Sequence, residues 1–115
     1  MKHIHTSRAR GKMFAPILSS PALQAALMTL RPGKVSGEFF NEHPKAEQWL
    51  FVVSGSGTAR FSGRRITIKQ GSLLLIEKAE KHQIINTGKG TLVTLNFYAP
   101  PAYTASGEVR PAVEN

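Results

Sequence analysis

The sequence predicts an all-β protein, a sandwich or closed barrel in which the number of strands fits a jelly roll. Three observations lead to this prediction: short runs of β-branched and aromatic residues, glycine-bearing turns between them, and the regular spacing of both through the middle of the chain. The sequence shows no internal repeat and no low-complexity tract that would indicate another architecture.

The first of these strands is expected over residues 24–30. Periodicity alone leaves this run open between helix and strand, but Pro32-Gly33 ends it and the β-rich chain that follows favours a strand. A second strand is expected over 48–53, where β-branched and aromatic residues precede a Ser-Gly-Ser-Gly turn. The remaining strands are expected over 58–61, 65–68, 73–76, 82–86 and 91–98, with Ser62-Gly63 as a hairpin turn between the first two of them.

Length and composition limit the class of protein. A chain of 115 residues is large enough for one domain with one core. The absence of cysteine excludes disulfides and thiolate metal ligands. The basic N-terminus lacks the apolar stretch of a secretory signal, and no run approaches the ~20 apolar residues of a membrane helix. We therefore expect a soluble, cytoplasmic protein with no membrane partner.

The charge balance is strongly basic. Fifteen Lys and Arg face seven acids, all of them Glu, for a net charge of +8. Such a balance is compatible with nucleic-acid binding, but the basic residues form only a loose group at positions 2–12 and a pair at Arg64 and Arg65. The scatter favours a solvated surface that prefers anionic small molecules and argues against a nucleic-acid partner.

Two segments, 37–55 and 71–86, each hold one histidine near the end of an apolar strand pattern. In a small barrel, strands that are distant in sequence lie close together, so His43 and His82 can meet inside it. We therefore expect a polar site in an otherwise apolar cavity, and we expect this cavity to carry the function.

The segment from Gly71 resembles the second cupin motif. Its spacing matches at Gly71, His82 and Asn86, while Glu77 and Ala79 stand where that motif normally has Pro and Gly. The first cupin motif asks for His-x-His, then a Glu and, six residues further, a Gly. Placing that Gly at Gly55 puts three residues on the other motif positions: Gln48 for the Glu, His43 for the second His and Asn41 for the first.

Residues 31–33 and 96–101 are also similar to single-domain bacterial cupins. The resemblance implies a double-stranded β-helix, or jelly-roll, cupin barrel over residues 24–101. Residues 1–23 are then an N-terminal strand or arm, and 102–115 a C-terminal tail that forms an arm or a disordered end. The cupin barrel hosts many reactions and also non-enzymatic binding, so the resemblance alone does not select an activity.

The resemblance also implies a metal site with an altered ligand set. Typical cupins offer three His and one Glu, which suit Fe, Mn, Ni, Cu or Zn, whereas this chain offers His43, His82, Gln48 and Asn41. Strand alternation places Asn41 and His43 on one face and points Gln48 and His82 inward. Neutral imidazoles remain good ligands, whereas amide oxygens are poor ones. Two alternatives stay open: a divalent metal on His43, Gln48, His82 and water, or a metal-free cavity with hydrogen-bonded histidines.

Other side chains are expected at the pocket or in the core beside it: Met28, Phe40, Leu50, Ile84, Asn96 and Tyr98. For the apolar members the core is the commoner role. Asn96 and Tyr98 alternate on the last strand and would orient a polar ligand if they point inward. Glu42 and Glu47 are expected to point outward, and His3-Ile-His5 at the chain start is too small a set for a metal site.

If Gln48 points inward, alternation turns Trp49, Phe51 and Val53 outward. An apolar outer face predicts a homodimer interface or a packed second sheet. For function, we expect a small-molecule-binding cupin, either a metal-dependent enzyme of dioxygenase or isomerase type acting on an oxygenated or anionic metabolite, or a metal-free binding or sensor module. The sequence leaves open whether the protein is an enzyme.

Overall fold

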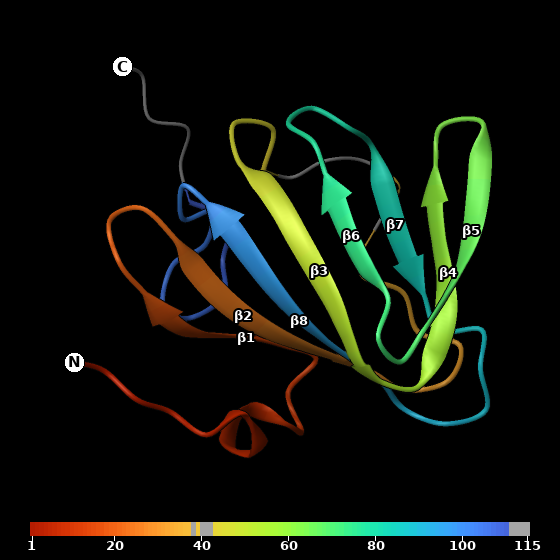
Figure 1. The fold of residues 1–115 in the computed structure, drawn as a ribbon, viewed down its shortest axis with the longest axis horizontal. Coiled ribbons are helices and arrows are strands. Elements are labelled where there is room, and N and C mark those ends of the chain that lie inside the picture. The colour runs from red at the N-terminus through yellow and green to blue at the C-terminus, as the bar shows by residue number, and fades with distance from the viewer. Residues whose placement is uncertain (38, 40–42, 111–115) are drawn as a thin grey trace.

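A computed structural model describes residues 1–37, 39 and 43–110 of the chain. Within these residues the protein has one short 3-10 helix, η1 (Thr6–Ala9), and eight strands (Figure 1). The strands are β1 (Phe14–Ser19), β2 (Gln24–Leu30), β3 (Glu47–Ser54), β4 (Ser56–Phe61), β5 (Arg64–Lys69), β6 (Leu73–Ile76), β7 (His82–Ile85) and β8 (Leu92–Ala99).

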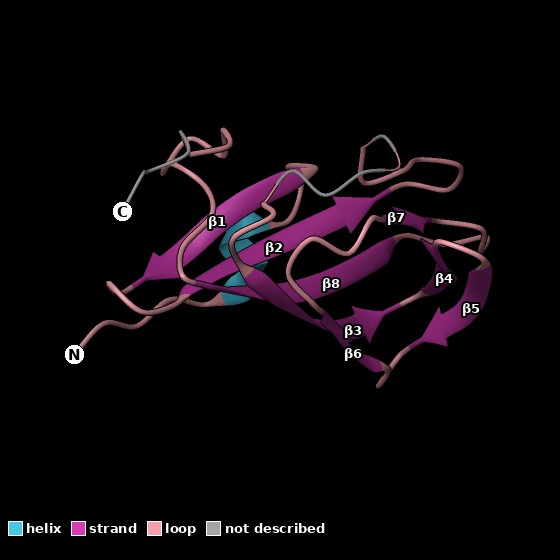
Figure 2. Cartoon of the chain, turned by 90° about the horizontal axis from the view of Figure 1, so that it is seen from above, coloured by secondary structure: helices cyan, strands magenta, loops and turns pink. Residues whose placement is uncertain are grey.

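The strands form two antiparallel sheets. The larger sheet has the order β1-β2-β8-β3-β6 and the smaller one the order β5-β4-β7 (Figures 1 and 2). The all-β prediction is confirmed, and each expected strand agrees with the observed one to within two residues. β1, which pairs with the outer edge of β2, lies in the segment expected as an N-terminal strand or arm.

Two tight turns depend on glycine. Gly63 closes the predicted hairpin between β4 and β5 at a φ of +76°. Gly55, between β3 and β4, has a φ of +86°, and a Cβ there would collide with the backbone oxygen of Thr91. A side chain at position 55 would therefore suffer both backbone strain and a steric clash, which accounts for glycine at this motif position.

The inward-facing side chains of the larger sheet change from polar to apolar along the barrel. In the first cross-strand row Gln24 pairs with Tyr98, which pairs with Gln48. In the last row Leu30 pairs with Leu92. The change runs in the same spatial direction on β2, β3 and β8, so one end of the barrel is polar and the other is apolar. We refer to them as the polar end and the apolar end.

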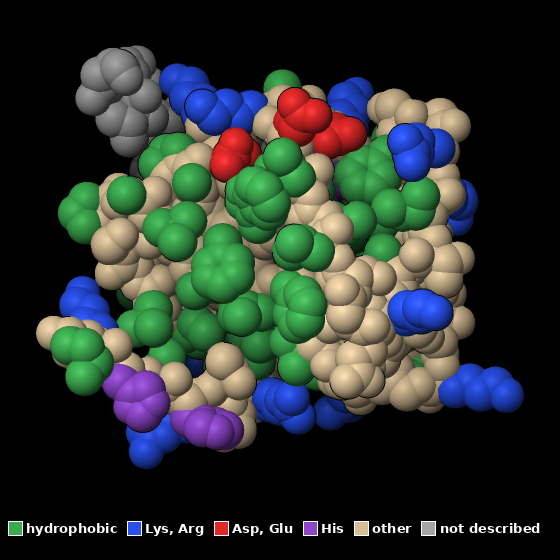
Figure 3. Space-filling model, in the orientation of Figure 1, with side chains coloured by type: hydrophobic (Ala, Val, Ile, Leu, Met, Phe, Trp, Pro, Cys, Tyr) green, Lys and Arg blue, Asp and Glu red, His purple; other side chains and the backbone are tan. Residues whose placement is uncertain are grey.

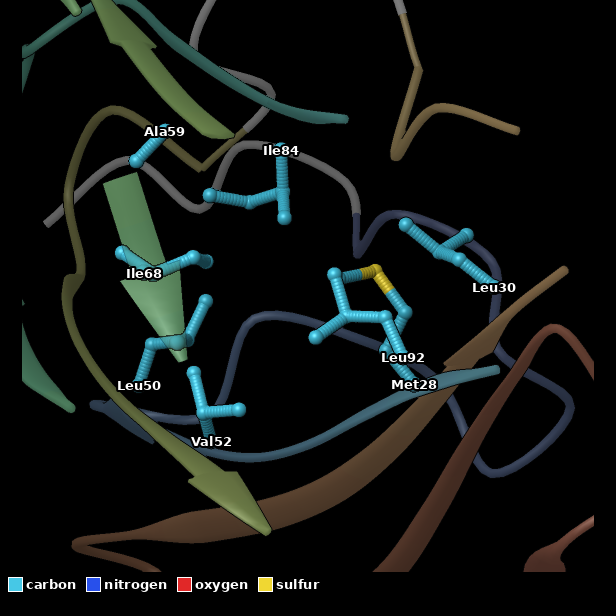
Figure 4. Close-up of a cluster of buried hydrophobic side chains, with 8 residues drawn as sticks. All are labelled: Met28, Leu30, Leu50, Val52, Ala59, Ile68, Ile84 and Leu92. Atoms are coloured by element: carbon cyan, nitrogen blue, oxygen red, sulfur yellow. The ribbon is translucent and has the colours of Figure 1, made fainter. Parts of the chain in front are cut away.

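The apolar end holds the main hydrophobic core (Figure 4). Eight buried side chains from both sheets meet there: Met28, Leu30, Leu50, Val52, Ala59, Ile68, Ile84 and Leu92. All of them except Met28 are less than 2 % exposed. Burial of this surface joins the two sheets and is the main source of stability.

The outer face of the larger sheet is also apolar, as the alternation predicts. Trp49 and Phe51 are exposed on β3, and Leu73 and Leu75 on β6 are 60 % and 43 % exposed. Figure 3 shows hydrophobic side chains gathered across this side of the molecule. We call these four residues the outer patch. Among the described residues, no helix is long and apolar enough to cross a membrane.

The chain beyond β8 folds back over the polar end. Tyr103 forms a β-bridge with Val109, and the turn between them is closed by a hydrogen bond from the Thr104 amide to the carbonyl of Glu108. Gln24, buried on β2, accepts hydrogen bonds from the amides of Ala102 and Tyr103 at 3.1 and 3.0 Å. It also donates to the carbonyl of Tyr103 at 2.8 Å. Residues 102–110 thus form a hairpin clamped to the barrel by one side chain; we call it the C-terminal hairpin.

Candidate functional site

A cavity of about 400 Å³ opens at the polar end of the barrel. Its walls come from β1, β2, β3, β7 and β8, from the loops around residues 36 and 43, and from the C-terminal hairpin. The lining residues are Met13, Phe14, Met28, Ser36, Gly37, His43, Gln48, His82, Ile84, Tyr98, Tyr103, Gly107, Glu108 and Val109. Both predicted histidines and the predicted glutamine therefore line one cavity.

His43 reaches the cavity from a turn rather than from a strand. It precedes β3, its carbonyl accepts a hydrogen bond from the amide of Ala46, and its side chain is 5 % exposed. The prediction that His43 lies on a strand with Asn41 is wrong for His43, because Pro44 lacks an amide donor and favours a turn. Asn41 itself, a predicted ligand, and Phe40, a predicted pocket residue, lie outside the described residues, as does Glu42.

His82 begins β7 and points inward, as predicted. Its ring centroid is 5.3 Å from that of His43, so residues far apart in sequence meet. Nδ1 of His82 lies 3.1 Å from the carbonyl oxygen of Glu80, and Nδ1 of His43 lies 3.4 Å from that of Ala46. A carbonyl oxygen can only accept, so both contacts favour a proton on Nδ1. In the neutral imidazole the lone pair is then on Nε2, the arrangement found when a histidine binds metal through Nε2.

Gln48 lies beside the histidines and points inward from β3, as predicted. It is 3 % exposed, and its Nε2 donates to Oδ1 of Asn96 at 2.9 Å. Its Oε1 is buried and has no hydrogen-bond partner among the described residues. Because a buried polar atom without a partner is costly, a ligand atom that paired with this oxygen would be favourable.

Aromatic side chains form one wall of the cavity. Tyr98 packs against His43 with ring centroids 4.9 Å apart, and Tyr103 packs against Tyr98 at 5.0 Å. Phe14 completes the wall, 4.6 Å from Tyr103. Of these three residues the sequence predicts only Tyr98, because Phe14 and Tyr103 lie outside the cupin motifs. The one signal for Tyr103 is an isolated aromatic residue in an otherwise small and polar tail.

The remaining pocket predictions divide into two groups. Met28 and Ile84 line the cavity. Leu50 and Asn96 do not line it: they pair with each other one row deeper, where Leu50 is fully buried in the core and Asn96 lies behind Gln48. Strand alternation gives the direction of a side chain but not its depth, and this depth places both residues behind the cavity wall.

The other candidates are accounted for outside the cavity. Glu47 accepts a hydrogen bond from Nε1 of the outward-facing Trp49 at 2.9 Å, so its predicted outward direction is confirmed. His3 and His5 are exposed, and Nδ1 of His5 accepts from the amide of Ser7 at the start of η1. His5 therefore caps a helical turn.

The polar atoms of the cavity set its chemistry. Among the described residues that line it there is no Lys or Arg, although the chain carries fifteen of them, and Glu108 is the one charged residue of this described lining. Over residues 1–37, 39 and 43–110, no three His, Cys, Asp or Glu side chains gather as a metal site. Besides the carboxylate of Glu108, the described lining includes two imidazoles and one side-chain amide, from His43, His82 and Gln48. Such a set of nitrogen and oxygen donors is compatible with Zn, Cu, Fe or Ni.

Comparisons with known proteins agree with this architecture. The family model described as the Cupin domain matches residues 26–98. The solved structure of BH2720 from Bacillus halodurans superposes with a TM-score of 0.80 at 24 % identity, over 90 % of this chain and 81 % of that one. A predicted oxalate decarboxylase from Thermotoga maritima superposes with a TM-score of 0.68 at 27 % identity, over 76 % of this chain and 79 % of that one.

One curated relative is similar over part of the chain. The tetracenomycin polyketide synthase protein TcmJ of Streptomyces glaucescens is 27 % identical over 59 residues, which is 51 % of this chain. The matched segment spans only 38 % of TcmJ's own length.

Proposed function

This chain belongs to the cupin family, and we propose that it binds a small oxygenated molecule at a divalent metal ion held by His43, Gln48 and His82. One observation carries the proposal: Gln48, whose buried Oε1 has no hydrogen-bond partner among the described residues, lines the same cavity as two histidines whose Nδ1 atoms face carbonyls. The three side chains thus offer lone pairs rather than protons. A bound cation would give the buried Oε1 of Gln48 a partner.

In this proposal the metal and the side chains around the cavity have separate roles. When bound, the metal would supply Lewis acidity toward an oxygen of the ligand. The aromatic wall of Phe14, Tyr98 and Tyr103 would hold the carbon skeleton and exclude water. Because the donor set is neutral, the ion would keep its full charge and attract an oxygenated or anionic ligand although no Lys or Arg lines the cavity. An activity of dioxygenase or isomerase type is compatible with this arrangement.

A metal-free binding module is the second candidate, and the same neutral donor set favours it. Because none of His43, Gln48 and His82 is a carboxylate, these three side chains offer no charge to offset that of a divalent ion. In that case the lone pairs of the histidines and Gln48 would accept hydrogen bonds from hydroxyl or amine groups of a ligand. The absence of Lys and Arg from the cavity lining then favours a neutral or cationic ligand over an anionic one.

Elemental analysis of tag-free protein separates the two candidates. The metal proposal expects near-stoichiometric Fe, Mn, Ni, Cu or Zn in the wild type, loss of the metal in His82→Ala and a severe loss in His43→Ala. His3→Ala, at an exposed position, is the control and should keep the wild-type content. Protein that is purified empty and refuses added metal would instead support the metal-free module. Full metal content in both cavity variants would contradict the ligand assignment.

We also propose that a second copy of the chain covers the outer patch. Strands β3, β6 and β8 contain no Lys or Arg, whereas the chain as a whole has a net charge of +8. Two copies can therefore approach through these strands without bringing lysine or arginine side chains together. Light scattering should give the mass of a dimer for the wild type and of a monomer for Leu73→Lys. A wild-type monomer at micromolar concentration would contradict the proposal.

A further inference from the structure

We propose that Asn96, which does not line the cavity, is a positioning residue that makes Gln48 offer its oxygen, and not its NH2 group, to whatever binds there. This inference rests on the proposed metal site for its functional meaning. Its structural basis is a chain of hydrogen bonds behind the cavity wall, in which each donor and acceptor can be assigned from its neighbours.

The orientation of the Asn96 amide is fixed by backbone groups. Its Nδ2 contacts the carbonyl oxygens of Thr94 and Ala26 at 3.3 and 3.4 Å and the hydroxyl oxygen of Thr94 at 2.9 Å. Since a carbonyl oxygen can only accept, the nitrogen of the Asn96 amide must be on this side. Asn96 is 1 % exposed, so water cannot replace these partners. Its Oδ1 therefore faces Gln48.

The orientation of Gln48 follows from that of Asn96. An oxygen facing Gln48 at 2.9 Å requires a donor, so the Gln48 group on this side is Nε2. Gln48 lines the cavity and Asn96 does not, so the other end of the Gln48 amide is turned to the cavity side. That end is Oε1, which has no partner among the described residues. Two backbone carbonyls thus determine, through Asn96, that position 48 is an acceptor.

The chain of hydrogen bonds from the backbone carbonyls through Asn96 to Gln48, which we call the relay, determines what kind of ligand the site accepts. With Oε1 on the cavity side, Gln48 adds a third lone pair to those of His43 and His82. If the amide were turned by half a rotation, its NH2 group would repel a cation. Positions 48 and 96 are also coupled: in Gln48→Glu a carboxylate oxygen would face Oδ1 of Asn96, two acceptors in contact. Asn96 would then have to turn and bring its own oxygen against the carbonyls of Thr94 and Ala26.

Two variants of Asn96 separate positioning from general stability. Asn96→Leu removes the acceptor for Nε2, so the Gln48 amide loses its preferred orientation. Asn96→Asp keeps an acceptor for Nε2 but loses the bonds from Nδ2 to Thr94 and Ala26. Both variants should lower the melting temperature. Only Asn96→Leu should lower the affinity for Zn²⁺ in the folded protein, by about tenfold or more, as for partners that orient metal ligands.

Zn²⁺ affinity is measured by calorimetric titration of folded protein, as judged by circular dichroism. Asn96→Asp should stay within about threefold of the wild type, well below the tenfold effect of a lost orienting partner. A purely structural role would give equal affinities in all folded variants, or losses that follow the melting temperatures. Wild-type Zn²⁺ affinity in Asn96→Leu would overturn the inference.

NMR spectroscopy of the metal-free protein tests the orientation without any metal. The side-chain NH2 protons of Gln48 should exchange slowly and show contacts to Asn96 and Thr94, and both features should be lost in Asn96→Leu. If the wild type binds no metal but shows these contacts, the proposed metal site fails while the relay stands. Contacts from the Gln48 NH2 protons to the rings of His43 or His82 would overturn the relay itself.

Discussion

The two ends of the barrel are built from the same strands but use them differently. At the apolar end, Leu30 and Leu92 are fully buried and pack with other apolar side chains from both sheets. At the polar end, Gln24, Tyr98 and Gln48 occupy the equivalent inward positions, and the strands enclose about 400 Å³. A few inward side chains at each end of β2, β3 and β8 therefore determine whether that end forms a stabilising core or a candidate binding site.

The polar end obtains its order from hydrogen bonds rather than from close apolar packing. Gln24 fixes the C-terminal hairpin and Asn96 fixes Gln48, and both side chains are buried. Buried polar networks of this kind define one geometry because each missing partner is costly. We therefore expect substitutions at the apolar end to change stability, and those at the polar end to change binding or local order.

The largest effect on stability is expected from Leu92→Ala at the apolar end. Leu92 is fully buried, so the substitution leaves a cavity among the core side chains and should lower the free energy of unfolding by about 2–5 kcal/mol. Urea denaturation measures this change, and Leu23→Ala, at a 42 % exposed leucine, is the matched control. Ligand or metal affinity of the folded variant should stay at the wild-type value; a large loss of affinity would break the distinction between the ends.

A smaller effect is expected from Gln24→Ala at the polar end. The variant leaves the buried amides of Ala102 and Tyr103 without their acceptor, which should cost about 1–3 kcal/mol. The cost should appear as local opening of the C-terminal hairpin, seen as faster proteolysis within 102–110, while the barrel melts close to the wild-type temperature. Gln70→Ala, at an exposed glutamine, should leave proteolysis unchanged. Unchanged cleavage in Gln24→Ala would show that the clamp is not needed.

The two regions also differ in how far the sequence predicts them. The barrel follows from local patterns: alternation, glycine turns and the cupin motif spacing place Gln48 and His82 inward, as the structure has them. The position of Tyr103 in the aromatic wall could not be predicted, because the backbone of Tyr103 is held by Gln24, a contact between segments far apart in sequence. The turn at His43 was not predicted, because strand alternation was applied to Asn41 and His43 although Pro44 directly follows.

The smallest effect is expected at Ala79, in the loop that leads to His82. Ala79 has a φ of +66°, a left-handed conformation that costs a residue with a Cβ about 1 kcal/mol. Ala79→Gly, which restores the usual motif residue, should therefore raise the free energy of unfolding by less than about 1 kcal/mol, since glycine also has more unfolded-state entropy to lose. Thermal denaturation measures the gain, and Ala22→Gly, at an exposed alanine with φ outside the left-handed region, should not show it. A lower melting temperature for Ala79→Gly would contradict strain at this position.

The most direct test of the site is an NMR titration of the four histidine side chains with Zn²⁺. In the metal-free protein, long-range ¹⁵N–¹H spectra should show His43 and His82 protonated at Nδ1, toward the carbonyls of Ala46 and Glu80. Added Zn²⁺ should then shift the Nε2 resonances of both residues together, with saturation at one equivalent. Shifts confined to the exposed His3 and His5, or no shift at all, would contradict a metal site at the polar end.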